Sequence, residues 1–234
     1  MSGIFYNPNI VPLGGTGDST LDAHGVLLGE GTSPVATVSG SSTGQVLTWV
    51  STSADPTFQT PSVGGLVLLT SGTIAAPTAT LDIVLTSYIA YRGLKFVLYG
   101  FIPSTNAVEL YVRFSTDGGV SYIASGYNYA LWSVLDSAAS GANASGSDSK
   151  IIVGVSVGNG TTQGISTEME LFNPTNTALW SRVFFQSYLI SSLAQGRIDI
   201  GGGAQESAQD TDAIRFLFSA GNIASGGYAV YGYA

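Results

Sequence analysis

The sequence predicts an all-β protein in which an extended, glycine-rich N-terminal anchor and neck precede an antiparallel, jelly-roll-like β-sandwich. From residue 65 onward, strand-length segments recur between turns rich in Gly, Asn and Ser. No segment keeps an apolar period of 3.6 residues, which an amphipathic helix would show. The composition also changes near residue 65, since the first basic residue of the chain is Arg92. We therefore divide the chain into an anchor and neck, residues 1–64, and a sandwich, residues 65–234.

The N-terminal part contains three apolar segments of strand length, at 25–29, 34–38 and 45–50, each bounded by Gly or Pro. They are too few and too separated to form a core within one chain. Either the region is a flexible linker, or it buries its apolar side chains against other copies of the chain. The side chains concerned are Val26, Leu27, Leu28, Val46, Leu47 and Trp49. Recurring Val-Leu pairs are untypical of flexible linkers, so we expect an oligomeric neck of intertwined short strands.

The C-terminal part alternates in the way that half-buried strands do. In the segment 108–114, Val108, Leu110, Val112 and Phe114 lie on one face and the more polar residues on the other. The other expected strands are 65–70, 80–86, 94–101, 121–124, 126–132, 150–157, 165–171, 180–188, 197–200, 213–218 and 228–233. The stretch 136–149 is rich in Ser, Gly and Ala, and we expect it to be an exposed loop.

The composition excludes several classes of function. Charged residues make up 9% of the chain, whereas about a quarter is ordinary, and the net charge is −8. Nucleic-acid binding and attachment to anionic membranes need clustered Lys and Arg, so we expect neither. The chain has no Cys and a single His, His24. Thiolate zinc sites and most His-based metal sites or proton relays are thereby excluded, and we expect no cofactor.

The first residues carry no basic region followed by a long apolar stretch, so we expect no signal peptide. No run of about 20 apolar residues is present either, so we expect no membrane insertion. Ile4, Phe5 and Tyr6 form an uncharged apolar cluster near the N-terminus. Exposed apolar groups of this kind mark contact sites, so we interpret these three residues as an anchor to a partner protein.

Three groups of residues suggest catalysis or metal binding, and each has a simpler explanation. The segment 40–44 matches G-x-S-x-G, but no helix and no downstream His follow it, as a nucleophile elbow requires. Glu168 and Glu170 share a strand face and could form a carboxylate pair for glycoside hydrolysis, although a solvated face explains them as well. Asp210 and Asp212 are weak candidates for calcium ligands. We expect a protein that is not an enzyme.

The aromatic residues suggest a ligand more strongly. Tyr127 and Tyr129 share a strand face, and Trp132 and Trp180 lie near strand ends. Aromatic rings stack on the apolar faces of sugars, and low charge suits a neutral glycan. Alternatively, these residues fill half-buried sheet edges and interfaces, as Tyr and Trp often do.

The order and spacing of motifs in the neck resemble a known family. The segments 25–35 (GVLLGEGTSPV), 44–48 (GQVLT) and 54–59 (ADPTFQ) resemble the shaft or neck of tailed-phage and prophage fibre proteins. The segments 112–122, 126–129 and 214–226 resemble distal domains of such proteins more loosely. The resemblance implies a fibre, spike or adsorption protein in the virion of a tailed phage or a gene transfer agent.

The resemblance also implies an assembly. Such proteins are commonly homotrimers, contact other virion proteins through the N-terminus, and attach to the host surface through the distal domain. We expect host attachment through a cell-surface glycan. The alternatives are a free lectin or adhesin and, less in keeping with the chain length, a polysaccharide depolymerase.

Overall fold

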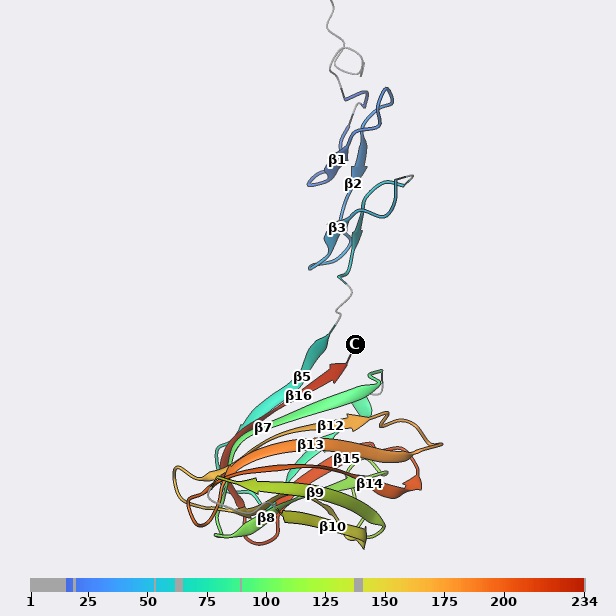
Figure 1. Cartoon of the computed structure of the whole chain (residues 1–234). Coiled ribbons are helices and arrows are strands. Elements are labelled where there is room, and N and C mark those ends of the chain that lie inside the picture. The colour runs from blue at the N-terminus through green and yellow to red at the C-terminus, as the bar shows by residue number, and fades with distance from the viewer. Residues whose placement is uncertain are drawn as a thin grey trace, which may run out of the picture. The chain divides into compact units, whose positions relative to one another are not determined.

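The computed structural model describes residues 16–18, 20–52, 54–61, 65–88, 90–136 and 141–233. The chain divides into two units, Met1–Val63 and Gly64–Ala234 (Figure 1). Each unit is described by itself.

The N-terminal unit contains two short antiparallel hairpins. Strand β1 (Val26–Leu28) pairs with β2 (Ala36–Val38), and β3 (Val46–Thr48) pairs with β4 (Thr57–Gln59). None of the described residues between 16 and 61 is buried. The unit therefore has strands but no core of its own in a single chain, and the intertwining of its strands with other copies stays a prediction.

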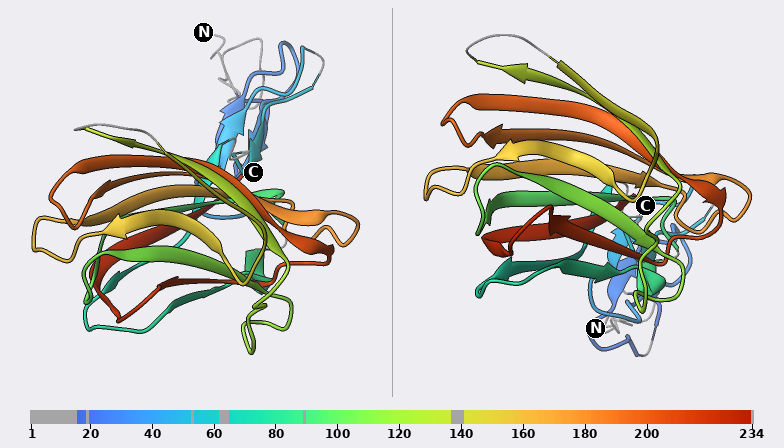
Figure 2. Two further views of the ribbon diagram at one scale, coloured as in Figure 1. Left: turned by 60° about the horizontal axis from the view of Figure 1, so that its bottom comes forward. Right: turned by 90° about the horizontal axis from the view of Figure 1, so that it is seen from below.

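The C-terminal unit consists of two antiparallel sheets, one of eight strands and one of four. The order in the large sheet is β10-β9-β14-β13-β12-β7-β16-β5, and in the small sheet β11-β8-β15-β6. Figure 2 shows the small sheet lying against one face of the large one. The large sheet comprises β5 (Leu66–Ile74), β7 (Gly93–Pro103), β9 (Tyr127–Leu135), β10 (Gly141–Asp148), β12 (Gly164–Phe172), β13 (Trp180–Ile190), β14 (Gly196–Ala208) and β16 (Ile223–Tyr233). The small sheet comprises β6 (Leu81–Val84), β8 (Val108–Ser115), β11 (Ile151–Val157) and β15 (Ala213–Phe218). The predicted all-β class is confirmed.

The core lies between the two sheets and follows from strand alternation. Val108, Leu110, Val112 and Phe114 of β8 are all buried, as the sequence predicts. Aromatic pairs join the sheets: Phe96 of β7 meets Phe216 of β15 with ring centroids 5.9 Å apart. Such pairs add to the free energy gained by burying apolar area.

Buried polar side chains also connect the sheets. Asp199 of β14 is fully buried, and its Oδ2 accepts a hydrogen bond of 2.9 Å from the backbone N–H of Val155 on β11. Its Oδ1 accepts from Ser133 Oγ at 2.6 Å and from Arg197 Nε at 2.7 Å. The carboxylate is thus paired and hydrogen-bonded, as a buried charge must be. These contacts fix β11 where its pairing with β8 is irregular.

Two sequence predictions about the strands are wrong. Within the stretch 136–149, expected to be a loop, Gly141–Asp148 form the edge strand β10, which pairs with β9. Small residues allow this edge strand because β9 pairs with the backbone groups on one side of it and its side chains need little burial. Conversely, residues 121–124 form no strand, although the N–H of Ile123 donates to the carbonyl oxygen of Phe114 at 2.9 Å.

The last strand, β16, lies between β5 and β7 in the large sheet. It pairs antiparallel with both, so the beginning and the end of the unit form adjacent strands (Figure 1). In the described part of the chain, no helix is long and apolar enough to cross a membrane. The helical element found there is a short 3-10 turn, η2 (Thr86–Tyr88).

Candidate functional site

The large sheet has one face that the small sheet does not cover, and we call it the outer face. Strand register arranges its side chains in rows that cross the sheet. In one row, Ser166 on β12 pairs with Tyr188 on β13, and Tyr188 pairs with Ile198 on β14. In the next, Glu168 pairs with Gln186, and Gln186 pairs with Ile200. These rows place apolar, aromatic and polar side chains side by side on an open surface.

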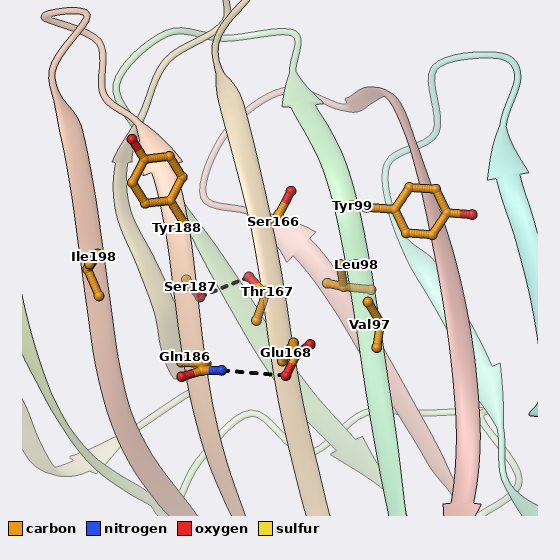
Figure 3. Close-up of a pocket in the computed structure, with 10 residues that line it drawn as sticks. All are labelled: Val97, Leu98, Tyr99, Ser166, Thr167, Glu168, Gln186, Ser187, Tyr188 and Ile198. Atoms are coloured by element: carbon orange, nitrogen blue, oxygen red, sulfur yellow. Dashed lines mark hydrogen bonds between the residues drawn. The ribbon is translucent and has the colours of Figure 1, made fainter. Parts of the chain in front are cut away.

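A hollow of about 380 Å³ opens on this face over strands β7, β12, β13 and β14. We call it the tyrosine hollow, since Tyr99 and Tyr188 lie on its two sides with Ser166 between them (Figure 3). Both tyrosines are about half exposed, at 46% and 56%. The strands that carry them are two spacings apart, about 9.5 Å. The hollow is lined by Val97, Leu98, Tyr99, Ser166, Thr167, Glu168, Gln186, Ser187, Tyr188 and Ile198.

Polar groups meet in the lower part of the tyrosine hollow. Lys95 Nζ lies 2.8 Å from Glu168 Oε2, and Gln186 Nε2 donates to the same oxygen at 3.4 Å (Figure 3 shows the second contact). The hydrogen bond from Lys95 lowers the pKa of Glu168. A negative Glu168 accepts hydrogen bonds and does not donate them. Together with the hydroxyl of Ser166, it offers polar partners for a ligand rich in hydroxyl groups.

A second, shallower hollow of about 600 Å³ lies on the same face over β9, β13 and β14. We call it the tryptophan hollow. Trp180 and Arg182 stand along β13, and Ala130, Gly202 and Ala204 form a floor of small residues. The hollow is lined by Asn128, Tyr129, Ala130, Trp180, Arg182, Val183, Gly202, Gly203 and Ala204.

Two of the four predicted ligand-binding aromatics are buried, although Tyr129 contributes to the lining of the tryptophan hollow. Tyr127 and Tyr129 share a face of β9 as predicted, but that face points into the core, with exposed fractions of 0% and 7%. The Tyr127 hydroxyl accepts from the N–H of Phe114 at 2.8 Å and donates to the carbonyl oxygen of Ile123 at 3.2 Å. Burial raises the pKa of Tyr127 to about 12. Both tyrosines therefore stabilise the core, and their assignment as stacking residues is corrected.

The other two predicted aromatics, Trp132 and Trp180, lie on the outer face. Trp132 is half exposed and pairs with Ile200, in the row that includes Glu168 and Gln186. Trp180 is 45% exposed and lines the tryptophan hollow. The structure thus brings both tryptophans to the face that carries the two hollows.

The catalytic candidates have structural surroundings that explain them. In the segment 40–44, Gln45 Oε1 accepts from the backbone N–H groups of Ser41 and Ser42 at 2.8 and 3.1 Å, which closes a turn. Glu168 and Glu170 point to the outer face, while Met169 and Leu171 are buried, as predicted. Glu170 accepts from the Tyr233 hydroxyl. A general acid needs a raised pKa, whereas the pKa of Glu168 is lowered.

The calcium candidates do not form a cluster. Among the described residues, no three His, Cys, Asp or Glu side chains lie together in a way that could hold a metal ion. Asp210 and Asp212 therefore lack a third carboxylate. Asp117, a further acidic residue in the turn after β8, accepts hydrogen bonds from Ser121 and Ser115, which lower its pKa to about 2. His24 is exposed in the turn before β1, and the anchor residues Ile4, Phe5 and Tyr6 lie outside the described residues.

Sequence reasoning missed Tyr99, Tyr188 and Arg182. Tyr188 alternates with buried residues on β13, so its exposure could have been predicted from that pattern. Tyr99 lies just before the irregular pairing of β7 with β12, and a pattern alone does not locate such a bulge. Arg182 could have been noticed as one of only seven basic residues.

Comparison of the chain with protein-family models, with curated proteins and with solved structures finds no match in any of the three. The functional argument therefore depends on the geometry of the two units and on the neck motifs.

Proposed function

We propose that the protein is a fibre or spike of a tailed-phage or phage-like particle, which presents its β-sandwich to glycans on the host surface. The N-terminal residues dock onto other virion proteins, and the neck joins copies of the chain, most simply three. Its site of action is the virion. The proposal rests on the neck motifs in 25–35, 44–48 and 54–59 and on three features of the structure.

The observation that carries the proposal is the contrast between the two units. The sandwich has a complete core, whereas none of the described residues from 16 to 61 is buried. A single two-stranded hairpin is at best marginally stable in water. Apolar side chains nevertheless recur there with large exposed fractions: Leu21 43%, Leu27 48%, Val46 48%, Leu47 42%, Trp49 67% and Val50 50%. Association with further chains gives these side chains the burial that one chain does not provide.

The neck also has space for side chains from another copy. A hollow of about 450 Å³ lies beside Trp49, between residues of the first hairpin such as Leu28 and residues of the second such as Pro56. Its lining combines Leu28 and Trp49 with the carboxylates Glu30 and Asp55. Side chains of a second copy therefore have both apolar and polar partners there, which supports an oligomeric neck.

The outer face of the sandwich supports glycan attachment. Aromatic side chains at the rim and a few polar groups within are the usual composition of a small-molecule site. The tyrosine hollow has both, with Tyr99 and Tyr188 at its sides and Ser166, Glu168 and Gln186 between them. The rings supply surfaces for the C–H face of a sugar, and the polar groups supply partners for its hydroxyls.

Cell attachment by particles tests the glycan part of the proposal. Particles that carry Tyr188→Ala should bind host cells at least tenfold more weakly, because a stacking surface is lost. The matched control is Val120→Ala, an exposed apolar residue in the loop after β8. Equal binding by the two variants would contradict glycan attachment through this hollow.

Particle incorporation tests the virion part. Deleting residues 2–13, which include Ile4, Phe5 and Tyr6, should abolish incorporation into particles and leave the sandwich folded by circular dichroism. Normal incorporation of the shortened chain would contradict the anchor. Sedimentation of the full-length protein apart from particles would indicate a free adhesin instead, and release of reducing sugars from host polysaccharide would indicate a depolymerase.

A further inference from the structure

The tryptophan hollow has a chemistry that the tyrosine hollow lacks, because it includes an arginine without a carboxylate partner. We propose that this hollow binds an acidic sugar, with Arg182 pairing its carboxylate and Trp180 stacking on its ring. The inference rests on the proposed glycan attachment and specifies the class of glycan, namely one that contains uronic acid units.

A glycine leaves the floor of the hollow without a side chain at its centre. Gly202 of β14 lies between Ala130 of β9 and Phe184 of β13 in the strand register. A Cβ atom at Gly202 would lie 2.9 Å from the carbonyl oxygen of Val183, so that a side chain there would force the strands apart. The resulting space of about 600 Å³ is within the range of ligand sites.

The ion pairs of the sandwich leave Arg182 without a carboxylate partner. The chain has 15 acidic and 7 basic residues, so carboxylates are abundant. Four of the basic side chains are held in ion pairs: Lys95, Lys150, Arg197 and Arg215. Arg182 is exposed, and within the described part of the chain its guanidinium contacts no carboxylate and makes no hydrogen bond. Its five N–H donors are therefore free for a ligand.

One carboxylate, that of Glu206, is hydrogen-bonded to a residue that lines the hollow. Glu206 Oε1 accepts a hydrogen bond of 3.1 Å from Asn128 Nδ2, and Asn128 lines the hollow. This bond leaves Asn128 Oδ1 as an acceptor for a sugar hydroxyl. Lys95 also lies on the outer face, but it forms an ion pair with Glu168 in the tyrosine hollow. Among the described residues that line the tryptophan hollow, Arg182 is thus the one cation, and Glu206 next to Asn128 keeps its negative charge.

The spacing of the two main groups suits a single acidic sugar ring. Trp180 and Arg182 are two residues apart on β13, so they project from the same face about 7 Å apart. A pyranose with a carboxylate combines an apolar C–H face and a negative group within one ring. Arginine binds a carboxylate through two parallel hydrogen bonds, a geometry that lysine does not reproduce. A free inorganic anion would use Arg182 alone and leave Trp180 without a role.

Binding to matched oligosaccharides tests this inference. The probes are tetramers of galacturonic, glucuronic and mannuronic acid, each compared with its carboxyl-reduced, neutral counterpart, on the full-length protein. We expect at least one acidic tetramer to bind at least tenfold tighter than its neutral form. Arg182→Gln should remove this preference, and Arg182→Lys should keep only part of it. The control Arg92→Gln removes the same charge from an exposed residue outside the hollow and should keep the preference.

Three results would overturn the inference. They are the absence of binding to every acidic tetramer, equal binding of acidic and neutral forms, and an unchanged preference in Arg182→Gln. Displacement of the tetramer by millimolar inorganic phosphate, with no loss in Trp180→Ala, would reveal a general anion site and overturn it too. The proposed function fails separately, when Tyr188→Ala leaves the attachment of particles unchanged.

Discussion

At the scale of single residues, the hydroxyl of Tyr127 illustrates how a core tyrosine is satisfied. The ring packs edge to face against Phe114, with centroids 5.7 Å apart, and the hydroxyl contacts two backbone groups. The buried N–H of Phe114 donates its hydrogen bond to this hydroxyl. Removing the oxygen would leave that N–H without its partner, which costs more than the hydrogen bond itself contributes.

We therefore expect Tyr127→Phe to lower the free energy of unfolding by about 1–3 kcal/mol, measured by urea denaturation. The control Tyr129→Phe removes a hydroxyl that donates to Asn143 on the edge strand β10, and it should cost less. Because the folded-state pKa of Tyr127 is raised to about 12, the unfolded chain ionises first as the pH rises above about 10. The contribution of Tyr127 to stability is thus complete below about pH 10 and is lost progressively between about pH 10 and about pH 12. Equal costs for the two variants would contradict this role.

Trp132 provides the opposite case, a large side chain on the open surface. With 51% of its surface exposed, it contributes little to the core. We expect Trp132→Ala to weaken attachment of particles to cells by about 1–3 kcal/mol and to change the melting temperature little. A large fall in melting temperature with unchanged attachment would make Trp132 a packing residue.

At the scale of strands, the glycine run in β14 requires close approach of its neighbours. A Cβ atom at Gly203 would lie 2.7 Å from the carbonyl oxygen of Asn128 and 3.0 Å from Ile151 Cδ1. Gly141 of β10 has nothing within 4 Å of its Cβ position. We expect Gly203→Ala to destabilise the sandwich by about 1–3 kcal/mol, as overpacking does. Gly141→Ala should be close to neutral in the same thermal unfolding experiment, and similar values for the two would contradict the packing argument.

Strand alternation also shows which parts of the fold the sequence could predict. In β8 and β12 the aliphatic residues fall on one face only, so both the strand and its buried side could be predicted. In β9 both faces carry aromatic residues, Tyr127 and Tyr129 on one and Trp132 on the other. Alternation predicts which residues share a face, but it does not decide which of two apolar faces is buried. That depends on the partner sheet, which is why the ligand role of the two tyrosines was wrong.

The candidate site was less predictable than the fold for a related reason. Tyr99, Ser166 and Tyr188 come from three strands and meet only through the register of β7, β12 and β13. Strand β10 was missed because its residues Gly141–Asp148 show no apolar alternation. Its hydrogen bonds to β9, a tertiary contact, define it as a strand.

At the scale of the whole molecule, the neck predicts how the protein associates. We expect multi-angle light scattering to give the mass of three copies of the 24.0 kDa chain at micromolar concentration. The fragment 65–234 should stay folded, because its core lies entirely within it, but should associate more weakly. A monomer of the full chain at this concentration would contradict the oligomeric neck.

The position of β16 between β5 and β7 has a consequence for biosynthesis. Residues 223–233 leave the ribosome long after the strands to which they hydrogen-bond, since they follow the end of β7 by about 120 residues and the end of β5 by about 150. The large sheet can therefore close only after β16 has been made, and contacts so distant in sequence form slowly. Until then β5 and β7 expose unpaired edges, which favour aggregation. Deleting residues 223–233 would open the sheet between β5 and β7, and we expect the shortened chain to accumulate in insoluble form.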